Sequence, residues 1–331
     1  MERRKDAFMI MPHAIIAAFC AVLVSAVGGA HAQGYPKGPV RMIVPYPPGG
    51  GADTLARLVA AKMGDKLGQQ VIIDNKPGGN TIIGTEYAAK QRPDGQTLLY
   101  IPSSFSINPS LYKVPYSTEK DFAPIALVAQ VPFLLVSNLQ FPIRTVSDLI
   151  KAAKQKPGVI TFASYGAGSP AHLAGELFKF MTKTDMLHIP YKGSAPALTD
   201  VVGGQVFISF SSIEPAVVLV RANKLRGIAV TTAKRVSGVP EYPTIAESGI
   251  PGYEAIGWNG IVAPAGTPND IVQRLGNIIN DAIASPDLTE RFKTLGVEID
   301  LKSPAQFSTM IKDEIVKWAN VIKSANIKSP D

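Results

Sequence analysis

The sequence predicts an α/β protein of two domains, each a mostly parallel sheet flanked by helices. The chain has 331 residues, which is long enough for two domains of ordinary size. Short apolar runs alternate with amphipathic helical patterns, and this alternation is typical of a parallel sheet covered by helices. Glycine-rich turns between a strand and a helix also recur along the chain, at residues 45–51, 76–80 and 165–170.

The first 32 residues have the features of a secretory signal peptide. Three basic residues at positions 3–5 precede an apolar run over residues 15–27, and Ala30-His31-Ala32 supplies the small residues that a signal peptidase reads. We therefore expect export, with cleavage before Gln33. An uncleaved membrane anchor is the alternative, but this apolar run is short for a helix that spans a bilayer.

The composition of the exported part excludes several classes of protein. The only cysteine, Cys20, lies within the signal segment, so the mature chain has no thiol, disulfide or lipid-anchor cysteine. Because only His172 and His188 remain after processing, we expect neither a metal site nor a cofactor. The mature net charge of +6, from 30 basic and 24 acidic residues, is scattered along the chain, which argues against a nucleic-acid partner.

The first glycine turn lies between a strand at residues 40–44 and a helix that begins near residue 52. Its prolines exclude a helix, and its glycines let a ligand approach the main chain closely. The first-turn N–H groups of a helix have no intrahelical partner and lie at the positive end of its dipole. We therefore expect this turn to seat a carboxylate or phosphate without a cationic side chain. The candidate ligand-binding residues are Tyr46, Pro47, Pro48, Gly49, Gly50 and Ala52.

Two further strands, at residues 71–75 and 97–101, follow in the first domain with a helix at 83–90 between them. In an open parallel sheet, ligands bind beyond the carboxyl ends of the strands. We therefore expect the residues after the third strand to border the same crevice as the first glycine turn. These candidates are Ser103, Ser104 and Phe105. The alternative for both segments is a turn that only connects two elements.

A long apolar stretch at residues 124–138 predicts a strand that leaves one domain and enters the other. After a helix at 147–154 and a strand at 159–164, the glycine turn recurs at residues 165–170. The amphipathic pattern at 171–181 predicts the next helix. Ser169 is expected to be its N-cap, and Pro170 its first residue. A second anion seat of the same construction results. Its candidate residues are Ser164, Gly166, Gly168, Ser169 and His172.

The remaining chain completes the second domain and returns to the first. Strands are predicted at 187–191, 206–210 and 225–230, helices at 194–202 and 215–222, a returning strand at 255–263, and final helices at 268–284, 286–295 and 304–325. The last helix is long enough to pack across the first domain. Phe210 and Ser211, at the end of their strand, are further candidate ligand contacts.

Two strands that cross between two domains make a hinge. We expect domain I at residues 33–130 together with 254–331, and domain II at residues 131–253. The hinge strands are expected near residues 126–132 and 252–260. Two anion seats that face each other across such a hinged cleft would close on an anionic ligand.

Two enzyme-like patterns in the second turn are weak. Gly166-x-Gly168-x-x-Ala171 matches a dinucleotide fingerprint, but the acidic residue that should end the next strand is missing. Ser169 and His172 would be nucleophile and base in an exported hydrolase, yet no G-x-S-x-G elbow surrounds the serine. We therefore expect a helix cap and a satisfied histidine there, and no catalytic residue.

Asp53 and Arg57 lie four residues apart on the first helix and are expected to form a pair at the surface or the cleft edge. A carboxylate near an anion seat repels an anionic ligand. The seat therefore requires that the Asp53 oxygens cap the turn and point away from the ligand.

Nine segments, taken in order along the chain, carry a resemblance to a known family. They are YPKGPVRMIVPYPPGGGADTLARLVA, VIIDNKPGGN..IG, RPDGQTLL, NPSLYKVPYSTEKDFAPI, YGAGSPAHLAGELFK, HIPYKGSAPALTDVVGGQV, KLRGIAVTTAKR, PEYPTIAESGIPGYE and WNGIVAPAGTP. Over essentially its whole mature length, the chain resembles the substrate-binding proteins of tripartite tricarboxylate transporters, the Bug-type periplasmic receptors. The resemblance implies a two-domain periplasmic-binding-protein fold of type II, the venus-flytrap, without enzymatic activity. It also implies that the turns at 46–52 and 166–169 hold one carboxylate through main-chain N–H groups, helped by ordered water.

The same resemblance implies a monomer in the periplasm that takes a small carboxylate as its ligand. Its partners would be the membrane permease subunits of a tripartite tricarboxylate-type transporter. A receptor that docks on a sensor domain, as a signalling partner, is the alternative.

Many members carry Phe-Ala-Ala-Gly-Gly where this chain has Tyr46-Pro47-Pro48-Gly49-Gly50, which stiffens the loop and adds an aromatic hydroxyl. With Phe105 nearby, this favours a flat ligand, and our hypothesis is an aromatic dicarboxylate such as terephthalate. Citrate-like tricarboxylates and short aliphatic dicarboxylates are the alternatives.

Overall fold

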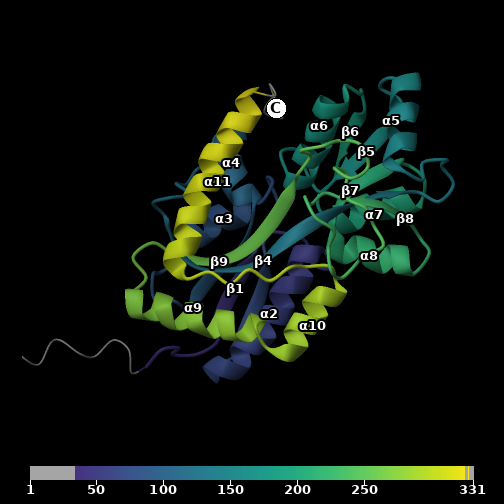
Figure 1. The fold of residues 1–331 in the computed structure, drawn as a ribbon. Coiled ribbons are helices and arrows are strands. Elements are labelled where there is room, and N and C mark those ends of the chain that lie inside the picture. Colours follow the sequence, from purple (N-terminus) through teal and green to yellow (C-terminus); the bar gives the residue numbers. More distant parts are fainter. Residues whose placement is uncertain (1–33, 325–326, 328–331) are drawn as a thin grey trace, which may run out of the picture.

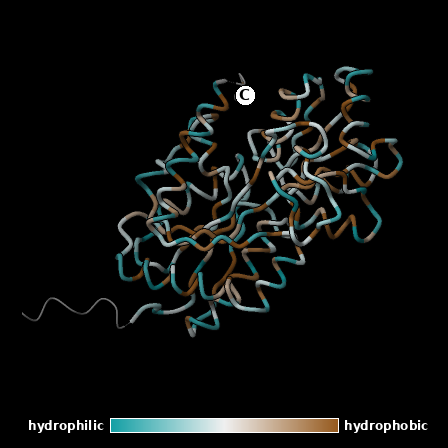
Figure 2. Tube along the Cα trace, viewed as in Figure 1, coloured by the Kyte–Doolittle hydropathy of each residue, from teal (hydrophilic) through white to brown (hydrophobic). Residues whose placement is uncertain are grey.

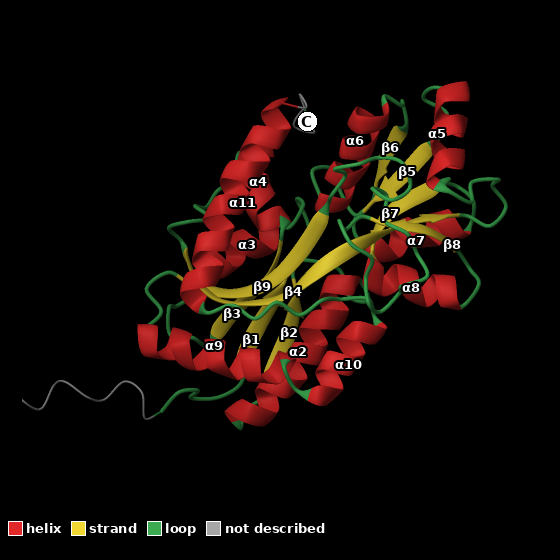
Figure 3. Ribbon diagram, viewed as in Figure 1, coloured by secondary structure: helices red, strands yellow, loops and turns green. Residues whose placement is uncertain are grey.

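The computed structural model describes residues 34–324 and residue 327. The predicted signal peptide at residues 1–32 and its cleavage before Gln33 lie outside these described residues. Within them, the strands form one mixed sheet in the order β2-β1-β3-β9-β4-β7-β5-β6, with β8 paired to β4. Helices flank this sheet along its length (Figure 3), which confirms the predicted α/β class.

The order of helices and strands follows the predicted order closely. The elements are β1 (Val40–Val44), α2 (Gly51–Leu67), β2 (Val71–Asn75), α3 (Ile82–Ala89), β3 (Thr97–Pro102), α4 (Ser104–Leu111), β4 (Phe122–Ser137), α5 (Val146–Gln155), β5 (Thr161–Ser164), α6 (Pro170–Thr182), β6 (Leu187–Pro190), α7 (Ser194–Val202), β7 (Ile208–Ser212), α8 (Ile213–Arg221), β8 (Arg226–Val230), β9 (Ile256–Pro264), α9 (Asn269–Ile283), α10 (Pro286–Thr294) and α11 (Pro304–Ser324).

The first lobe consists of strands β1, β2 and β3 with helices α2, α3, α4, α9, α10 and α11 (Figure 1). Strand β1 pairs in parallel with both β2 and β3, as the strand-helix-strand pattern predicts. Val40, Met42 and Val44 of β1 join one buried cluster, and Ile43 joins another that includes Phe307 of α11. Both faces of the sheet are therefore covered by helices, which explains why its strands are apolar almost throughout.

The second lobe consists of strands β5, β6, β7 and β8 with helices α5, α6, α7 and α8 (Figure 1). Strand β5 pairs in parallel with β6 and β7. A cluster that includes Phe162, Phe178 and Phe210 packs within this lobe. Figure 2 shows hydrophobic residues gathered along the strands and hydrophilic residues along the outer helices. The buried cluster of the first lobe also includes Leu198 of α7 and Ile213 of α8, so the two lobes share part of their apolar interior.

Strands β4 and β9 connect the lobes and pair antiparallel with each other. Strand β4 is 16 residues long. It pairs with β9 from Phe122 to Pro132, and from Phe133 onward it pairs with β7 and β8. The strand thus changes partners between Pro132 and Phe133, and Figure 1 shows β4 passing from one lobe to the other. The two predicted crossing strands are therefore present, although they run antiparallel to their neighbours.

Helix α4 is a departure from the prediction. It begins directly after β3, where the sequence predicts a turn at the crevice, and it contains Pro109. The helix turns Phe105 into the core, where the side chain is 1% exposed and packs near Tyr116 and Phe122. The expectation that Phe105 borders the ligand crevice is therefore wrong, because the strand-end rule does not anticipate a helix that begins within two residues.

Helix α8 also begins earlier than predicted, at Ile213 instead of Pro215. Proline is tolerated throughout the first turn of a helix, since the N–H groups there have no intrahelical acceptor. The earlier start places Glu214 in the first helical turn, next to the end of strand β7.

We expect Phe307→Ala to lower the free energy of unfolding by roughly 3–5 kcal/mol, because truncation of a fully buried ring leaves a cavity. The ring lies between α11 and the sheet and contacts Trp258 edge-to-face, with 5.6 Å between ring centroids. Urea unfolding followed by circular dichroism measures the loss. Phe180→Ala is the matched control, because that side chain is 64% exposed and its loss should cost less than about 0.5 kcal/mol. Equal losses in both variants would contradict this packing.

Candidate functional site

A cleft opens between the two lobes beside the N-terminus of α2. It contains about 630 Å³ of space not filled by atoms, part of it open to solvent. The crossing strands β4 and β9 contribute one wall. The lining residues are Tyr46, Pro47, Pro48, Gly50, Gly51, Ala52, Pro102, Ser103, Val131, Phe133, Tyr165, Gly193, Ser194, Ala195, Pro196, Ser212, Glu214, Gly257, Trp258 and Asn259.

The structure places only part of the predicted site at this cleft. The predicted residues that line it are Tyr46, Pro47, Pro48, Gly50, Ala52 and Ser103. Those that do not line it are Gly49, Ser104, Phe105, Ser164, Gly166, Gly168, Ser169, His172, Phe210 and Ser211. Phe210, like Phe105, is a core side chain. The first anion seat therefore faces the cleft, whereas the second does not.

The N-terminus of α2 presents main-chain donors to the cleft. Gly50 is the N-cap residue in an extended conformation, and the Thr54 N–H donates to Gly50 O at 3.0 Å. The N–H groups of Gly51 and Ala52 precede that bond, so they have no intrahelical partner and lie at the positive end of the helix dipole. An anionic group in the cleft is stabilised there without a cationic side chain.

The Asp53 carboxylate hydrogen-bonds to the turn itself and to neighbouring side chains. One carboxylate oxygen accepts hydrogen bonds from Gly49 N–H and Arg57 Nε, each at 2.9 Å, and the other accepts from Asn75 Nδ2 at 2.9 Å. Burial alone would raise the pKa of Asp53, but these hydrogen bonds outweigh it and lower the pKa. Asp53 therefore caps the turn, as the anion seat requires, and the Gly49 N–H is already in use.

Glu214 brings a second carboxyl group to the cleft from the other lobe. Its side chain is 3% exposed, and Oε2 has no hydrogen-bond partner among the described residues. A Cβ placed on Gly51 would lie 2.6 Å from Glu214 Oε1, so the glycine provides the room that the carboxyl group occupies. Burial raises the pKa of Glu214 to about 7. Because the cleft lining contains no Lys, Arg or His, no cationic side chain offsets this group.

Aromatic side chains form much of the remaining wall, namely those of Tyr46, Phe133, Tyr165 and Trp258. Tyr46 and Tyr165 meet edge-to-face between the lobes, with 5.9 Å between ring centroids. Burial raises the pKa of both phenols, so both are neutral at physiological pH. The Tyr46 hydroxyl is buried with no partner at hydrogen-bond distance among the described residues, and the neighbouring Ser104 hydroxyl partly offsets the rise in its pKa.

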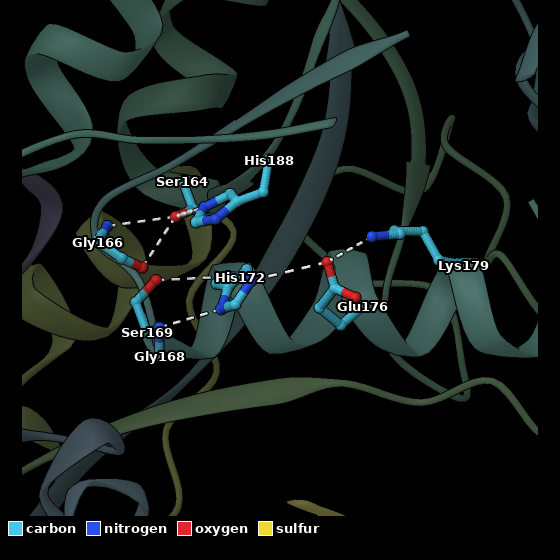
Figure 4. Close-up of polar contacts among 8 residues, drawn as sticks. All are labelled: Ser164, Gly166, Gly168, Ser169, His172, Glu176, Lys179 and His188. Atoms are coloured by element: carbon cyan, nitrogen blue, oxygen red, sulfur yellow. Dashed lines mark hydrogen bonds and ion pairs between the residues drawn. The ribbon is translucent and has the colours of Figure 1, made fainter. Parts of the chain in front are cut away.

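The second glycine turn uses its N–H groups internally (Figure 4). The Gly168 N–H donates to His172 Nδ1 at 3.0 Å, and the Gly166 N–H donates to Ser164 Oγ at 3.2 Å. Ser169 caps α6 by accepting the His172 N–H at 3.3 Å, which confirms the predicted helix start. Tyr165 brings this turn to the cleft, but the structure does not bring the N–H groups of the two glycine turns together around one cavity.

The same turn joins the two lobes beside the cleft. Tyr112, at the end of α4, donates its hydroxyl hydrogen to Ala167 O at 2.6 Å. A Cβ placed on Gly168 would lie 2.9 Å from Leu111, so the two segments are in close contact. This contact belongs to the interface between the lobes and lies outside the cleft lining.

The geometry excludes activation of Ser169 by His172. Ser169 is fully buried, and its hydroxyl serves as the helix cap. His172 Nδ1 accepts from the Gly168 N–H, while Nε2 lies 3.6 Å from a Glu176 carboxylate oxygen (Figure 4). The ring therefore has partners on both sides, and the hydrolase alternative has no support.

His188 on β6 is a half-buried, neutral partner of this cluster. Its ring stacks on His172 with 3.9 Å between centroids, and Nε2 lies 2.7 Å from Ser164 Oγ. Burial, reinforced by the neighbouring His172, lowers the pKa of His188 to about 3. The folded chain therefore carries His188 uncharged at neutral pH.

Sequence reasoning missed the second-lobe side of the cleft, which consists of residues 193–196 with Ser212 and Glu214. A signal was available for Glu214, because it follows closely on the carboxyl end of a strand and such ends face the ligand crevice. The predicted helix began at Pro215, so Glu214 was assigned to a connecting turn and was not considered as a site residue. Tyr165 was missed because it was read only as part of the second glycine turn.

Comparison with known proteins decides the family. Residues 55–327 match the profile described as "Tripartite tricarboxylate transporter family receptor". The chain belongs to this family. Its members are solute receptors of tripartite transporters and not enzymes, as the resemblance implied. Among the described residues, no group of three or more His, Cys, Asp or Glu could hold a metal ion, and no helix there is long and apolar enough to cross a membrane.

Similar proteins confirm the Bug-type resemblance and the fold. Protein BugT of Bordetella pertussis is 36% identical over 303 residues, which cover 90% of this chain and 92% of BugT. The structure of Rpa4515 of R. palustris with adipate has a TM-score of 0.87 at 36% identity and covers 89% of this chain and 99% of that chain. The periplasmic binding protein BugD has a TM-score of 0.84 at 35% identity, with coverage of 89% and 99%. The chain thus has the two-domain fold of periplasmic solute receptors.

Glu214 and His188 should contribute opposite pH dependences to the stability of the ligand-free protein. Their ordinary pKa values are 4.5 and 6.5. Between these values the unfolded chain binds a proton at His188 that the folded chain lacks, and the folded chain binds one at Glu214 that the unfolded chain lacks. The free energy of unfolding should therefore rise with pH in Glu214→Gln and fall with pH in His188→Gln, each by about 1.4 kcal/mol per pH unit relative to wild type.

Urea unfolding at several pH values from 4.5 to 6.5 measures these slopes. The double variant is the control, because removal of both groups should restore the slope of the wild type. Identical slopes in wild type and both single variants would contradict these pKa shifts.

Proposed function

We propose that the mature chain is a monomeric receptor that holds a carboxylated solute between its lobes and delivers it to the permease of a tripartite tricarboxylate-type transporter. One observation carries the proposal. The cleft combines the unpaired first-turn N–H groups of α2 with aromatic walls and lies between two lobes joined by two strands. Export after cleavage before Gln33 is part of the proposal, and light scattering on the purified protein checks the monomer.

The proposed domains are residues 33–130 with 254–331, and residues 131–253. The change of partners in β4 between Pro132 and Phe133 supports a hinge near 126–132. Strand β9, which begins at Ile256, supports the second hinge strand near 252–260.

We propose that one ligand carboxylate binds at the first turn of α2. Contacts from Tyr46, Gly50, Ala52 and Ser103 are supported by their place in the lining. The predicted contacts of Gly166 and Gly168 require a rearrangement that releases their N–H groups from Ser164 and His172.

The proposed ligand is an aromatic dicarboxylate such as terephthalate. Four aromatic rings and four prolines line the cleft, and such walls suit a flat, rigid solute. An aliphatic di- or tricarboxylate is the second candidate, because the similar protein Rpa4515 was determined with adipate.

Thermal unfolding of the ligand-stripped mature protein against terephthalate, benzoate, adipate, malate and citrate tests the ligand class. A ligand at one hundred times its Kd adds roughly 2.7 kcal/mol to the free energy of unfolding, which raises the melting temperature by several degrees. We expect the largest shift with terephthalate. Tight binding of an aliphatic acid while both aromatic acids fail would overturn the aromatic proposal, and no shift with any acid would overturn the receptor proposal for carboxylates.

We expect Gly50→Val to raise the Kd of the best acid by about tenfold or more, equivalent to about 1.4 kcal/mol. A Cβ on Gly50 would lie 3.1 Å from Ser194 Oγ, and both residues line the cleft, so the larger side chain obstructs it. Gly38→Val is the matched control, since a Cβ there meets nothing within 4 Å. Isothermal titration calorimetry measures both. Unchanged affinity in Gly50→Val would refute the first-turn site.

A further inference from the structure

The buried carboxyl group of Glu214 has no obvious role in a cleft that takes carboxylates. Glu214 and the first turn of α2 come from different lobes, yet the position of a Gly51 Cβ lies 2.6 Å from Glu214 Oε1. A ligand carboxylate bound at that turn therefore lies next to the Glu214 carboxyl group. Two ionised carboxylates in contact repel each other strongly where water is excluded.

We propose that Glu214 is a specificity-determining residue that binds the ligand in its protonated form, donating its carboxyl hydrogen to a ligand carboxylate, so that each ligand bound takes up one proton. This inference rests on the proposed carboxylate-binding function. A protonated carboxyl group has one O–H donor, and an ionised ligand carboxylate has only acceptors. The pairing satisfies Oε2, which has no partner among the described residues, and removes the repulsion.

The groups that face Glu214 favour the neutral carboxyl group. Tyr46 lies in the loop after β1, Tyr100 on β3 and Tyr165 after β5, and phenols are uncharged at neutral pH. The charged group on the facing helix α2 is Asp53, whose carboxylate is already held by Arg57 and Asn75. Arg221, on the same helix as Glu214, donates to Thr294 O and Gly238 O instead. No cation lines the cleft to hold Glu214 as an anion.

The proton makes the affinity depend on pH. Burial already raises the pKa of Glu214 to about 7 in the ligand-free protein, and an adjacent ligand anion raises the pKa further. Above pH 7 the free receptor loses its proton and must regain it on binding. Kd therefore rises by about tenfold per pH unit in that range, while carboxylate ligands themselves remain fully ionised.

Calorimetric titration with terephthalate and with adipate between pH 6 and pH 9 tests the inference. At pH 8 each titration is run in HEPES and in Tris, because the two buffers release different heats on ionisation and so reveal the number of protons taken up. Phosphate buffer is avoided, since phosphate would compete for the first turn of α2. For the wild type we expect uptake of one proton at pH 8 and a Kd that rises about tenfold per unit above pH 7. Glu214→Gln should bind with a Kd independent of pH and with no proton uptake, since the amide N–H replaces the carboxyl O–H.

Glu241→Gln is the matched control, because Glu241 is exposed and remote from the cleft lining, and it should keep the wild-type pH dependence. Binding of either acid by the wild type without proton uptake would overturn the inference and leave the receptor function intact. L-Glutamate, which carries an ammonium group, is titrated in addition. If the wild type binds L-glutamate and Glu214→Gln binds neither terephthalate nor adipate, the inference is also overturned, because Glu214 then acts as an anion toward the ammonium group. No binding of any acid at any pH would overturn the proposed function itself.

Discussion

The antiparallel pairing of β4 with β9 is the interaction on which the rest of the structure depends. The two strands are the covalent connection between the lobes, and β4 extends through both by changing partners at Phe133. Their middle residues also form one wall of the cleft, through Val131, Phe133 and residues 257–259. The same ladder therefore joins the lobes and forms part of the cleft wall.

No Lys, Arg or His lines the cleft, so backbone dipoles and hydroxyl groups are the groups there that can stabilise negative charge. Main-chain donors at a helix start are fixed in position and cost no side-chain entropy. These donors also carry only partial charge. A second anion nearby therefore removes a larger share of the electrostatic stabilisation of a bound anion than it would beside an arginine. Three hydrogen-bond donors hold the Asp53 carboxylate, whereas Glu214 Oε2 has no hydrogen-bond partner among the described residues.

Local sequence patterns were sufficient for most of the fold and for the first half of the site. Glycine and proline at 47–51, followed by a helical pattern, defined the α2 seat, and Ser169 was placed correctly as a cap. The failures come from long-range geometry. Nothing local indicates that His172 reaches back to the Gly168 N–H, or that α4 turns Phe105 inward. The residues of the second lobe that face the first lobe depend on how the two lobes pack. The hydropathy pattern within a single strand does not predict this packing.

The hydrogen bond from Tyr112 to Ala167 O lies outside the cleft, yet it links the two lobes. Such a contact lies outside the cleft lining, and removing it would lower the fraction of empty molecules in which the lobes meet as they do here. Where binding needs that arrangement, apparent affinity scales with that fraction. Altering position 112 would then tune the affinity and leave the residues that line the cleft unchanged, which suits a set of biosensors with one chemical selectivity and graded detection ranges.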